Sequence, residues 1–197
     1  MGASRRRHYA LLLCAILLAG SFASHSPTSL AQAVSRSGDI WLQVDTRDLT
    51  LTVMEGENIL RTYDNIAIGS NGPTWNKQVH DEKTPLGNFT INGIRQSERF
   101  SLFLAIDYPT MEHAQRALQD GRLNKAEFRA IRDAWINTLP PPQGTSLGGL
   151  LGILGIGLGS EDIHNSFNWS DGCIALTNAQ VEELAGLVRI GTRVSVR

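Results

Sequence analysis

The strongest constraint on the fold is a run of alternating apolar and polar residues between Ile40 and Ile68. The run divides into three segments, IWLQVD, LTLTVM and ILRTYDNIAI, which the turn sequences TRD and EGEN separate. Side chains of a β-strand point alternately to its two faces, so this alternation gives each segment one apolar face. Short connections between such segments predict an antiparallel meander.

The same pattern returns further along the chain. GNFTING and SLFLAIDY are two more strand candidates, CIAL is a shorter one, and TRVSVR closes the chain as another. Asn71-Gly72-Pro73 and Thr84-Pro85 mark loops, because Gly readily adopts positive φ and Pro fixes its own φ. These residues predict a mostly β domain.

The pattern changes in residues 110–139, where apolar residues recur three and four positions apart. The segment NKAEFRAIRDAWIN places Phe128, Ile131 and Trp135 on one face, and MEHAQRALQDG before it has similar spacing. This spacing is typical of helices that bury one side. Asn124 is suited to cap the second helix. We expect a helical hairpin inserted into the β domain.

Two segments near the C-terminus differ in their predicted structure. Residues 147–159 contain too many Gly residues for a stable helix, so we expect a loop packed beside the active region. In TNAQVEELAGLV, Thr177 and Gln180 stand at the spacing of a capping box. A C-terminal helix is therefore expected after Thr177.

The N-terminus has the order of a secretory signal peptide. Three arginines, Arg5–Arg7, precede an apolar run from Tyr9 to Ala19 and a small-residue stretch. The apolar run is about ten residues and a bilayer crossing needs about 20, so no permanent membrane span is expected. We expect cleavage after Ala33, with Ala23 as the alternative. Residues 1–33 are thus predicted to direct export to the periplasm or cell envelope.

Cleavage would leave residues 34–197 as one domain with an acidic balance. Without Arg5–Arg7, the 18 basic side chains fall to 15 against 19 acidic ones, and this gives no indication of nucleic acid binding. Cys14 leaves with the signal peptide, so Cys173 is the one remaining thiol. A lone Cys in an exported protein is a reactive thiol, an intermolecular disulfide or a buried apolar residue.

Cys173 lies between Gly172 and the strand candidate CIAL, which places the thiol at a loop-to-strand corner. A Gly before a nucleophile allows close approach of the backbone, whose N–H groups can hold an oxyanion. The reactive form is the thiolate, which a nearby base or positive charge favours. Such a corner is suited to a nucleophilic cysteine.

Three histidines of the domain could serve as that base. His164, nine residues before the thiol, is the best candidate, and its alternative is a structural role in the loop. His80 lies in a polar loop, where it contacts substrate or is a plain surface residue. His113 falls within a predicted helix and is expected to be solvated or packed there.

No metal or organic cofactor is expected. A zinc site from Cys173 and His164 lacks a third ligand. DGRLNKAEF resembles the second half of a calcium loop, but its first half places Arg116 and Leu118 where carboxylates are required. GILGIGLG lacks the strand before it and the helix after it that a dinucleotide site needs.

Two motifs together resemble the YkuD-type L,D-transpeptidases of the bacterial cell wall. HDEKTPLGNFTI is similar to the family's Thr-Pro-x-Gly-x-Phe/Tyr turn, which begins here at Thr84. IHNSFNWSDGCIALTN is similar to its Ser-x-Gly-Cys motif, here Ser170 to Cys173. The resemblance covers most of residues 40–197 and implies a β-sandwich or barrel-like fold, with the helical hairpin as an elaboration.

The chain departs from the family pattern at several positions. The usual form has His at the position of Asp171 and Arg at that of Ala175, and the Arg is a holder of substrate carboxylate. The family's catalytic His precedes a Gly, whereas His164 precedes Asn165. An alternative alignment puts Leu154 in this slot. In that case His164 is an accessory residue and catalysis is impaired.

The resemblance implies a mechanism for peptidoglycan stem peptides. His164 takes the proton of Cys173, the thiolate attacks a peptide carbonyl, and the amides of Gly172 and Cys173 hold the oxyanion. An amine of a second stem then resolves the thioester and forms a cross-link. If water resolves it, the same residues give a carboxypeptidase or amidase.

Further residues receive supporting roles in this scheme. Ser170 is expected to orient the imidazole, and Trp169 walls the pocket or packs elsewhere. The Asp171 carboxylate opposes thiolate formation unless it points away or pairs with the imidazole. His80 and Thr84 are weaker candidates for substrate contact.

Two alternative functions, neither of them enzymatic, remain open. A catalytically silent wall-binding domain is favoured by Leu154, Ala175 and Asp171 in the positions named above. A secreted dimer joined through Cys173 is the other. The sequence does not fix the oligomeric state.

Overall fold

The computed structural model describes residues 38–197, so the predicted signal peptide and its cleavage site lie outside the described residues. The strands are β1 (Ile40–Asp45), β2 (Thr50–Glu55), β3 (Asn58–Tyr63), β4 (Pro73–Thr74), β5 (Thr84–Pro85), β6 (Gly87–Ser97), β7 (Ser101–Ile106), β8 (Gly152–Gly155), β9 (Ile174–Leu176) and β10 (Arg193–Val196). The helices are α1 (Met111–Gln119), α2 (Lys125–Ile136), α3 (Glu161–Ser166) and α4 (Asn178–Leu187). Within this part of the chain, no helix has the length and apolar character needed to cross a bilayer.

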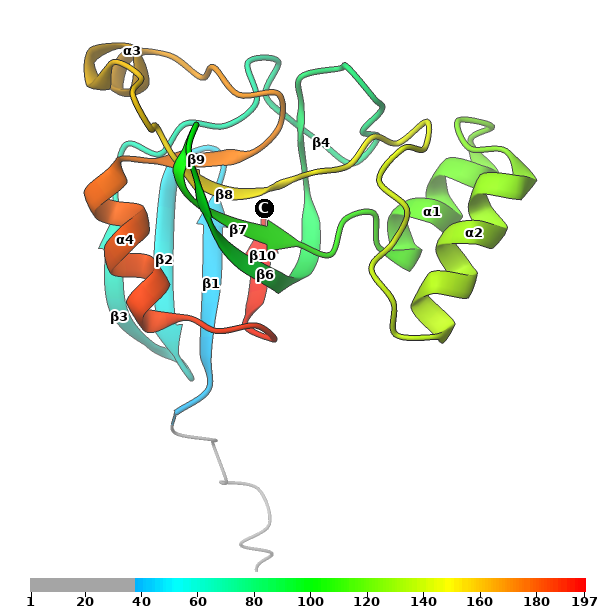
Figure 1. Cartoon of the computed structure of the whole chain (residues 1–197), viewed down its shortest axis with the longest axis horizontal. Coiled ribbons are helices and arrows are strands. Elements are labelled where there is room, and N and C mark those ends of the chain that lie inside the picture. Colours follow the sequence, from blue (N-terminus) through cyan, green and yellow to red (C-terminus); the bar gives the residue numbers. More distant parts are fainter. Residues whose placement is uncertain (1–37) are drawn as a thin grey trace, which may run out of the picture. The chain divides into compact units, whose positions relative to one another are not determined.

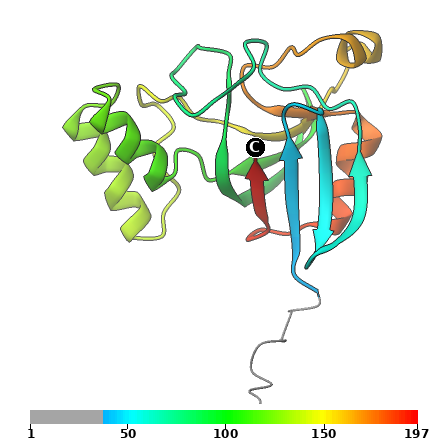
Figure 2. The same cartoon turned by 180° about the vertical axis from the view of Figure 1, so that it is seen from behind.

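Eight strands form one mixed sheet in the order β3-β2-β1-β10-β6-β7-β8-β9. β1, β2 and β3 make the predicted antiparallel meander, and β10 pairs in parallel with β1 (Figure 2). The long β6 joins the two halves of the sheet, because residues 87–90 pair with β10 and residues 91–97 with β7. The predicted mostly β fold is confirmed.

One apolar core cluster contains buried residues from both halves of the sheet. Alternate residues of β1, Leu42 and Val44, are fully buried, as the period-two pattern predicts. They join Leu104 of β7 and Ile153 of β8 in one apolar cluster. α4 covers β7, β8 and β9, and its predicted capping box at Thr177 is present. Burial of these side chains is the main stabilising contribution to the fold.

The predicted helical hairpin consists of α1 and α2 (Figure 1). Thr110 caps α1, and Asn124 caps α2 in a reciprocal capping box with Glu127. Ile131 is the fully buried residue of α2, at the centre of the predicted apolar face. The hairpin therefore forms for the reasons that its sequence indicates.

The prediction of a loop over residues 147–159 is wrong in part, because this segment contains β8. β8 pairs with both β7 and β9. A Cβ on Gly152 would lie 2.3 Å from the Leu104 carbonyl oxygen, so the missing side chain permits close strand pairing. The short helix α3 after this segment was not predicted. Its six residues are too few to show a helical period.

Candidate active site

The predicted loop-to-strand corner at Cys173 is present, directly before β9. Gly172 has a φ of +124°, which L side chains rarely adopt. A Cβ at this position would also lie 2.5 Å from the Lys83 carbonyl oxygen. The corner therefore requires Gly for two independent reasons.

Two hydroxyl groups fix the backbone of this corner. The Ser170 hydroxyl donates to the Cys173 carbonyl at 2.6 Å and accepts from the Gly172 N–H at 3.1 Å. The Thr84 hydroxyl donates to the Gly172 carbonyl at 3.1 Å and accepts from the Gly69 N–H at 2.8 Å. Thr84 is buried, with 1% of its surface exposed. Thr84, predicted as a substrate contact, thus holds the loop that carries Cys173 from within the protein.

These bonds change the expected oxyanion site. The Gly172 N–H already donates to Ser170, so it does not point freely toward a substrate carbonyl. Among residues 38–197, the Cys173 N–H makes no hydrogen bond outside the strand ladder. Of the two predicted amides, only that of Cys173 is available in this arrangement.

The Cys173 thiol is half-buried and unpaired. Its sulfur donates to the Leu150 carbonyl at 3.7 Å. Burial raises the pKa of the Cys173 thiol to about 11, the Gly152 backbone and Lys77 act to lower this pKa, and Asp171 raises it further. The resting site therefore contains a protonated thiol near neutral pH.

His164 lies in α3 and is buried, with 3% of its surface exposed. Its Nδ1 accepts a hydrogen bond of 3.3 Å from the indole N–H of Trp169, and its Nε2 has no partner within the described residues. Burial lowers the pKa of His164, against the opposing effects of Glu161 and the Asn65 backbone. The imidazole is therefore neutral at pH 7.

The structure does not bring His164 into hydrogen-bond contact with the thiol of Cys173. The imidazole bonds to Trp169, and the thiol bonds to Leu150. Ser170 was expected to orient the imidazole, but its hydroxyl is engaged at the corner and Trp169 takes that place. A general-base role for His164 stays a prediction.

Leu154, the alternative occupant of the histidine slot, lies in an apolar cluster beside the thiol. It is 2% exposed and pairs across β8 and β9 with Ala175. Cys173 and Trp169 pack against this cluster. Leu154 and Ala175, two departures from the usual motif, are thus adjacent, and they make this side of the thiol apolar.

The other predicted residues are distributed as follows. His80 is exposed and has a φ of 61°. Asp171 is exposed, and its backbone carbonyl accepts a 3.5 Å bond from Lys77. His113 is buried in α1, where its Nδ1 bonds to Thr110 and its Nε2 to the Leu86 carbonyl, so it packs in the helix and is not solvated.

Lys77 is a residue of the site that the sequence did not single out. It is 4% exposed and forms an ion pair with Asp81. The ammonium group also contacts the loop that carries Cys173, through the Asp171 carbonyl. A lysine in a polar loop gives no sequence indication of burial, although the spacing of four residues to Asp81 permits a pair.

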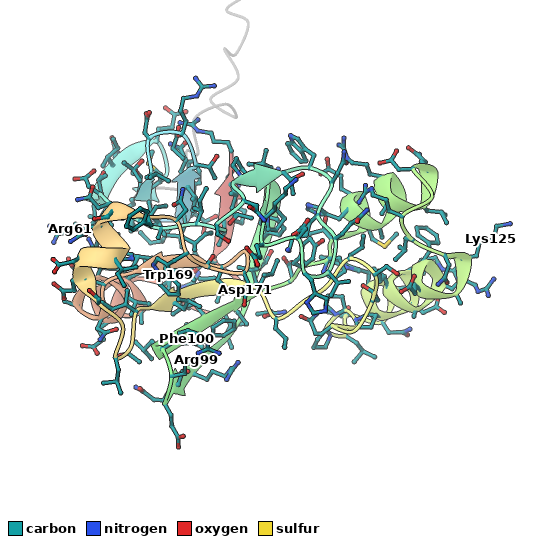
Figure 3. The ribbon with its side chains drawn as sticks, turned by 90° about the horizontal axis from the view of Figure 1, so that it is seen from above. Arg61, Arg99, Phe100, Lys125, Trp169 and Asp171 are labelled. Atoms are coloured by element: carbon teal, nitrogen blue, oxygen red, sulfur yellow. The ribbon has the colours of Figure 1, made fainter. Side chains whose placement is uncertain are left out.

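Trp169 lines a pocket of about 410 Å³. Phe100, Ile156 and Ile163 are among its other apolar lining residues, and Arg99 also lines it. Figure 3 shows Trp169 near Phe100 and Arg99, with Asp171 further toward the middle of the domain. The lining of this pocket does not include Cys173, so the prediction that Trp169 walls the substrate pocket stays a prediction.

The family model of the YkuD L,D-transpeptidase catalytic domain matches residues 39–196. This match spans nearly all of the described residues. The chain belongs to the YkuD family. The sandwich-like sheet, the Thr84 turn and the corner at Cys173 all lie within the matched range. The comparison with curated protein sequences found no match.

Solved structures similar to this YkuD domain include the helical cell shape determining protein Pgp2 from Campylobacter jejuni, at 19% identity and a TM-score of 0.53 over 80% of this chain and 47% of that chain. Bd1075 from Bdellovibrio bacteriovorus is 16% identical, with a TM-score of 0.54 over 84% of this chain and 50% of that chain. An L,D-transpeptidase C442S mutant from Enterococcus faecium is 17% identical, with a TM-score of 0.47 over 81% and 50%. The YkuD domain spans about half the length of these structures.

Within the described residues of the YkuD domain, no three His, Cys, Asp or Glu side chains gather where they could hold a metal ion. The groups at the corner are the Cys173 thiol and N–H, the Lys77 ammonium group and the exposed Asp171 carboxylate.

Proposed function

We propose that this YkuD domain is an exported, cysteine-dependent L,D-transpeptidase that acts on peptidoglycan stem peptides. The observation that carries the proposal is the rigid corner at Gly172 and Cys173 within a family match over residues 39–196. Thr84 and Ser170, which belong to the two motifs, both hold this corner. Such support would keep a nucleophile in one orientation, which favours attack on a bound carbonyl.

In the proposed reaction, the sulfur of Cys173 forms a bond to a stem-peptide carbonyl carbon. The C–N bond to the terminal D-residue breaks, and the thiol proton leaves with the departing amine. The Cys173 N–H is the available amide for the oxyanion of the tetrahedral intermediate. The product of this half-reaction is a thioester on the enzyme.

The resting thiol must ionise for this attack. With a pKa of about 11, only about one thiol in ten thousand is a thiolate at pH 7. We propose that substrate binding brings a base to the sulfur, since catalytic hydrogen bonds often tighten only in the complex. His164 serves as this base if α3 moves its imidazole away from Trp169.

An amine of a second stem peptide resolves the thioester by forming a new C–N bond, which restores the thiol and yields a cross-link. Water as the acceptor yields a free carboxylate instead, and the enzyme is then an L,D-carboxypeptidase. Both outcomes use the same nucleophile. We propose transfer as the main reaction, following the family.

The proposal is tested by incubating the purified domain with tetrapeptide stems and measuring the products by mass spectrometry. We expect release of the terminal D-residue and a cross-linked dimer, and Cys173→Ala should abolish both. His164→Ala should reduce turnover by at least 100-fold if the imidazole is the base. Release of the terminal D-residue without a cross-linked dimer would show that water is the acceptor. Absence of both product and acyl-enzyme contradicts the enzymatic proposal.

A catalytically silent wall-binding domain is the second candidate, and the site geometry gives it a specific basis. Leu154 and Ala175 are buried in an apolar cluster beside a protonated thiol that has no imidazole bonded to it. This candidate predicts that the domain binds isolated sacculi as well after Cys173→Ala as before, with no change in the stem peptides. Loss of sacculus binding would contradict it.

The proposed export depends on residues 1–33. We expect the protein recovered from the cell envelope to begin at Val34, as determined by N-terminal sequencing. Recovery of the intact N-terminus from the cytoplasm would contradict export.

A further inference from the structure

Lys77 is buried at the back of the corner that carries the proposed nucleophile. Only 4% of its surface is exposed, which is unusual for a lysine. Its ammonium group donates to the Asp81 carboxylate, to the Gln78 carbonyl at 3.3 Å and to the Asp171 carbonyl at 3.5 Å. All three of its hydrogen atoms therefore have acceptors, which makes burial of the charge tolerable.

The ammonium group lies directly against Gly172. A Cβ built on Gly172 would be 3.3 Å from both Nζ and Cε of Lys77. The charged groups that act on the Cys173 thiol are Asp171, which raises its pKa, and Lys77, which lowers it. Asp171 has the larger of these two effects on the thiol pKa, and Lys77 opposes it. Asp171 is exposed, whereas Lys77 is buried, so salt screens the charge of Asp171 more strongly.

Asp81 fixes the position of this ammonium group. Burial disfavours its charged form, but bonds from Lys77 and from the N–H groups of Gln78 and Lys83 hold the pKa of the Asp81 carboxyl below its ordinary value. Three donors on one carboxylate leave the loop of residues 77–83 little freedom. The lysine is therefore placed before substrate arrives.

The helical hairpin is hydrogen-bonded to the same loop. Arg122, in the turn between α1 and α2, donates to the Lys77 carbonyl at 3.2 Å and to the Asn76 side-chain oxygen at 3.2 Å. Arg122 also forms an ion pair with Asp120. The hairpin is thus connected through one arginine to the backbone of the buried lysine.

We propose that Lys77 places a buried positive charge beside the corner. This charge stabilises the Cys173 thiolate and the oxyanion that forms next to it. This inference rests on the proposed function and deepens it. The Gly172 N–H is occupied by Ser170, so the corner has one free amide where an oxyanion site usually has two donors. A nearby ammonium group in a water-poor environment compensates by charge, since charges interact more strongly there than in water.

The test is the pH dependence of Cys173 alkylation by iodoacetamide, which needs no substrate. The variants are Lys77→Met and Lys77→Gln, which remove the charge, with Lys125→Met as the matched control. Lys125 is an exposed lysine at the start of α2, far from the labelled Asp171 in Figure 3. Circular dichroism and thermal melting establish that each variant is folded.

We expect both charge-removing variants to alkylate on the order of tenfold more slowly at pH 8, with the rate profile displaced to higher pH. The Lys125→Met profile should match the wild type. A purely structural role for Lys77 would alter melting but leave the pH profile of the folded variant in place. An unchanged profile in a folded Lys77 variant would overturn the inference.

Asp81→Asn provides an independent test of the role of Lys77, which applies even if the Lys77 variants do not fold. Loss of the carboxylate leaves the ammonium charge uncompensated, so alkylation should become faster at pH 8. Slower or unchanged alkylation would contradict the inference. If alkylation depends on Lys77 but stem peptides are not turned over, only the proposed function is refuted. If stem peptides are turned over but alkylation does not depend on Lys77, only the inference about Lys77 is refuted.

Discussion

Thr84 connects the two motifs of the site through one hydroxyl group. It accepts from the Gly69 N–H and donates to the Gly172 carbonyl, and both bonds are buried. The corner at Cys173 therefore depends on a residue 89 positions earlier in the chain. Because this hydroxyl has no other role available, substitutions at Thr84 report on the corner itself.

We expect Thr84→Val to destabilise the domain by about 1–3 kcal/mol, since a buried donor and a buried acceptor lose their partner at nearly constant shape. Chemical denaturation measures this loss. The control is Thr62→Val, at an exposed position of β3 where the hydroxyl makes a long 3.5 Å contact with Thr52, and it should change the free energy of unfolding by less than about 0.5 kcal/mol. Equal effects of the two substitutions would contradict the assigned role of Thr84.

At the level of elements, α2 is tied to the loop that precedes β8. The Glu127 carboxylate accepts from the Ser146 N–H at 2.8 Å and from the Ser146 hydroxyl at 2.9 Å, and it closes the capping box with Asn124. The Ser146 carbonyl in turn accepts from the Val79 N–H. One side chain at the start of a helix therefore holds two loops near the corner.

The stability that the Glu127 carboxylate contributes through these bonds should depend on pH. Burial disfavours the Glu127 carboxylate, but the bonds from Ser146 and Asn124 prevail and lower its pKa below 4.5. A lowered folded-state pKa means that its stabilising contribution is complete above pH 4.5 and is lost as the pH falls through the folded-state value. The stability difference between wild type and Glu127→Gln should therefore shrink below pH 4.5, as denaturation at several pH values would measure.

The control for this experiment is Glu57→Gln, at an exposed turn residue. It should change the free energy of unfolding by less than about 0.5 kcal/mol at neutral pH. If the wild type remains more stable than Glu127→Gln by the same free energy well below pH 4, the assigned interaction between the Glu127 carboxylate and Ser146 is contradicted.

At the scale of the whole molecule, β10 lies inside the sheet, although it is the last strand in sequence. It pairs in parallel with β1 and antiparallel with β6. Val194 in this strand is 1% exposed. The strand joins the meander to the half of the sheet that carries the site, so the domain cannot form its core without it.

Val194→Asp should therefore prevent cooperative folding, because it places an unpaired carboxylate in the core. Leu60→Asp is the matched control, since Leu60 lies on the edge strand β3 and is 49% exposed. We expect the control to melt within a few degrees of the wild type in a thermal scan. A folded Val194→Asp variant would contradict the central position of β10.

Much of the fold could be predicted from local sequence. Alternation over β1 and β2, the helical spacing around Ile131, and the caps at Asn124 and Thr177 all act within a few residues, and the structure confirms each. β8 could not be predicted in this way. Its glycines suit either a loop or a close strand contact, and only the neighbouring strands decide between the two.

By itself the sequence determined the alternation that makes the domain mostly β, the capped helices, and the Gly before Cys173 that its corner requires. The tertiary structure alone decided that Trp169 bonds to His164, that Ser170 occupies the Gly172 N–H, and that Lys77 is buried beside them. The physical reason is the distance along the chain over which the interactions act. Helix caps and strand faces depend on neighbours in the chain, whereas the charge and hydrogen bonds around the thiol depend on segments about 100 residues apart that meet only in the folded sheet.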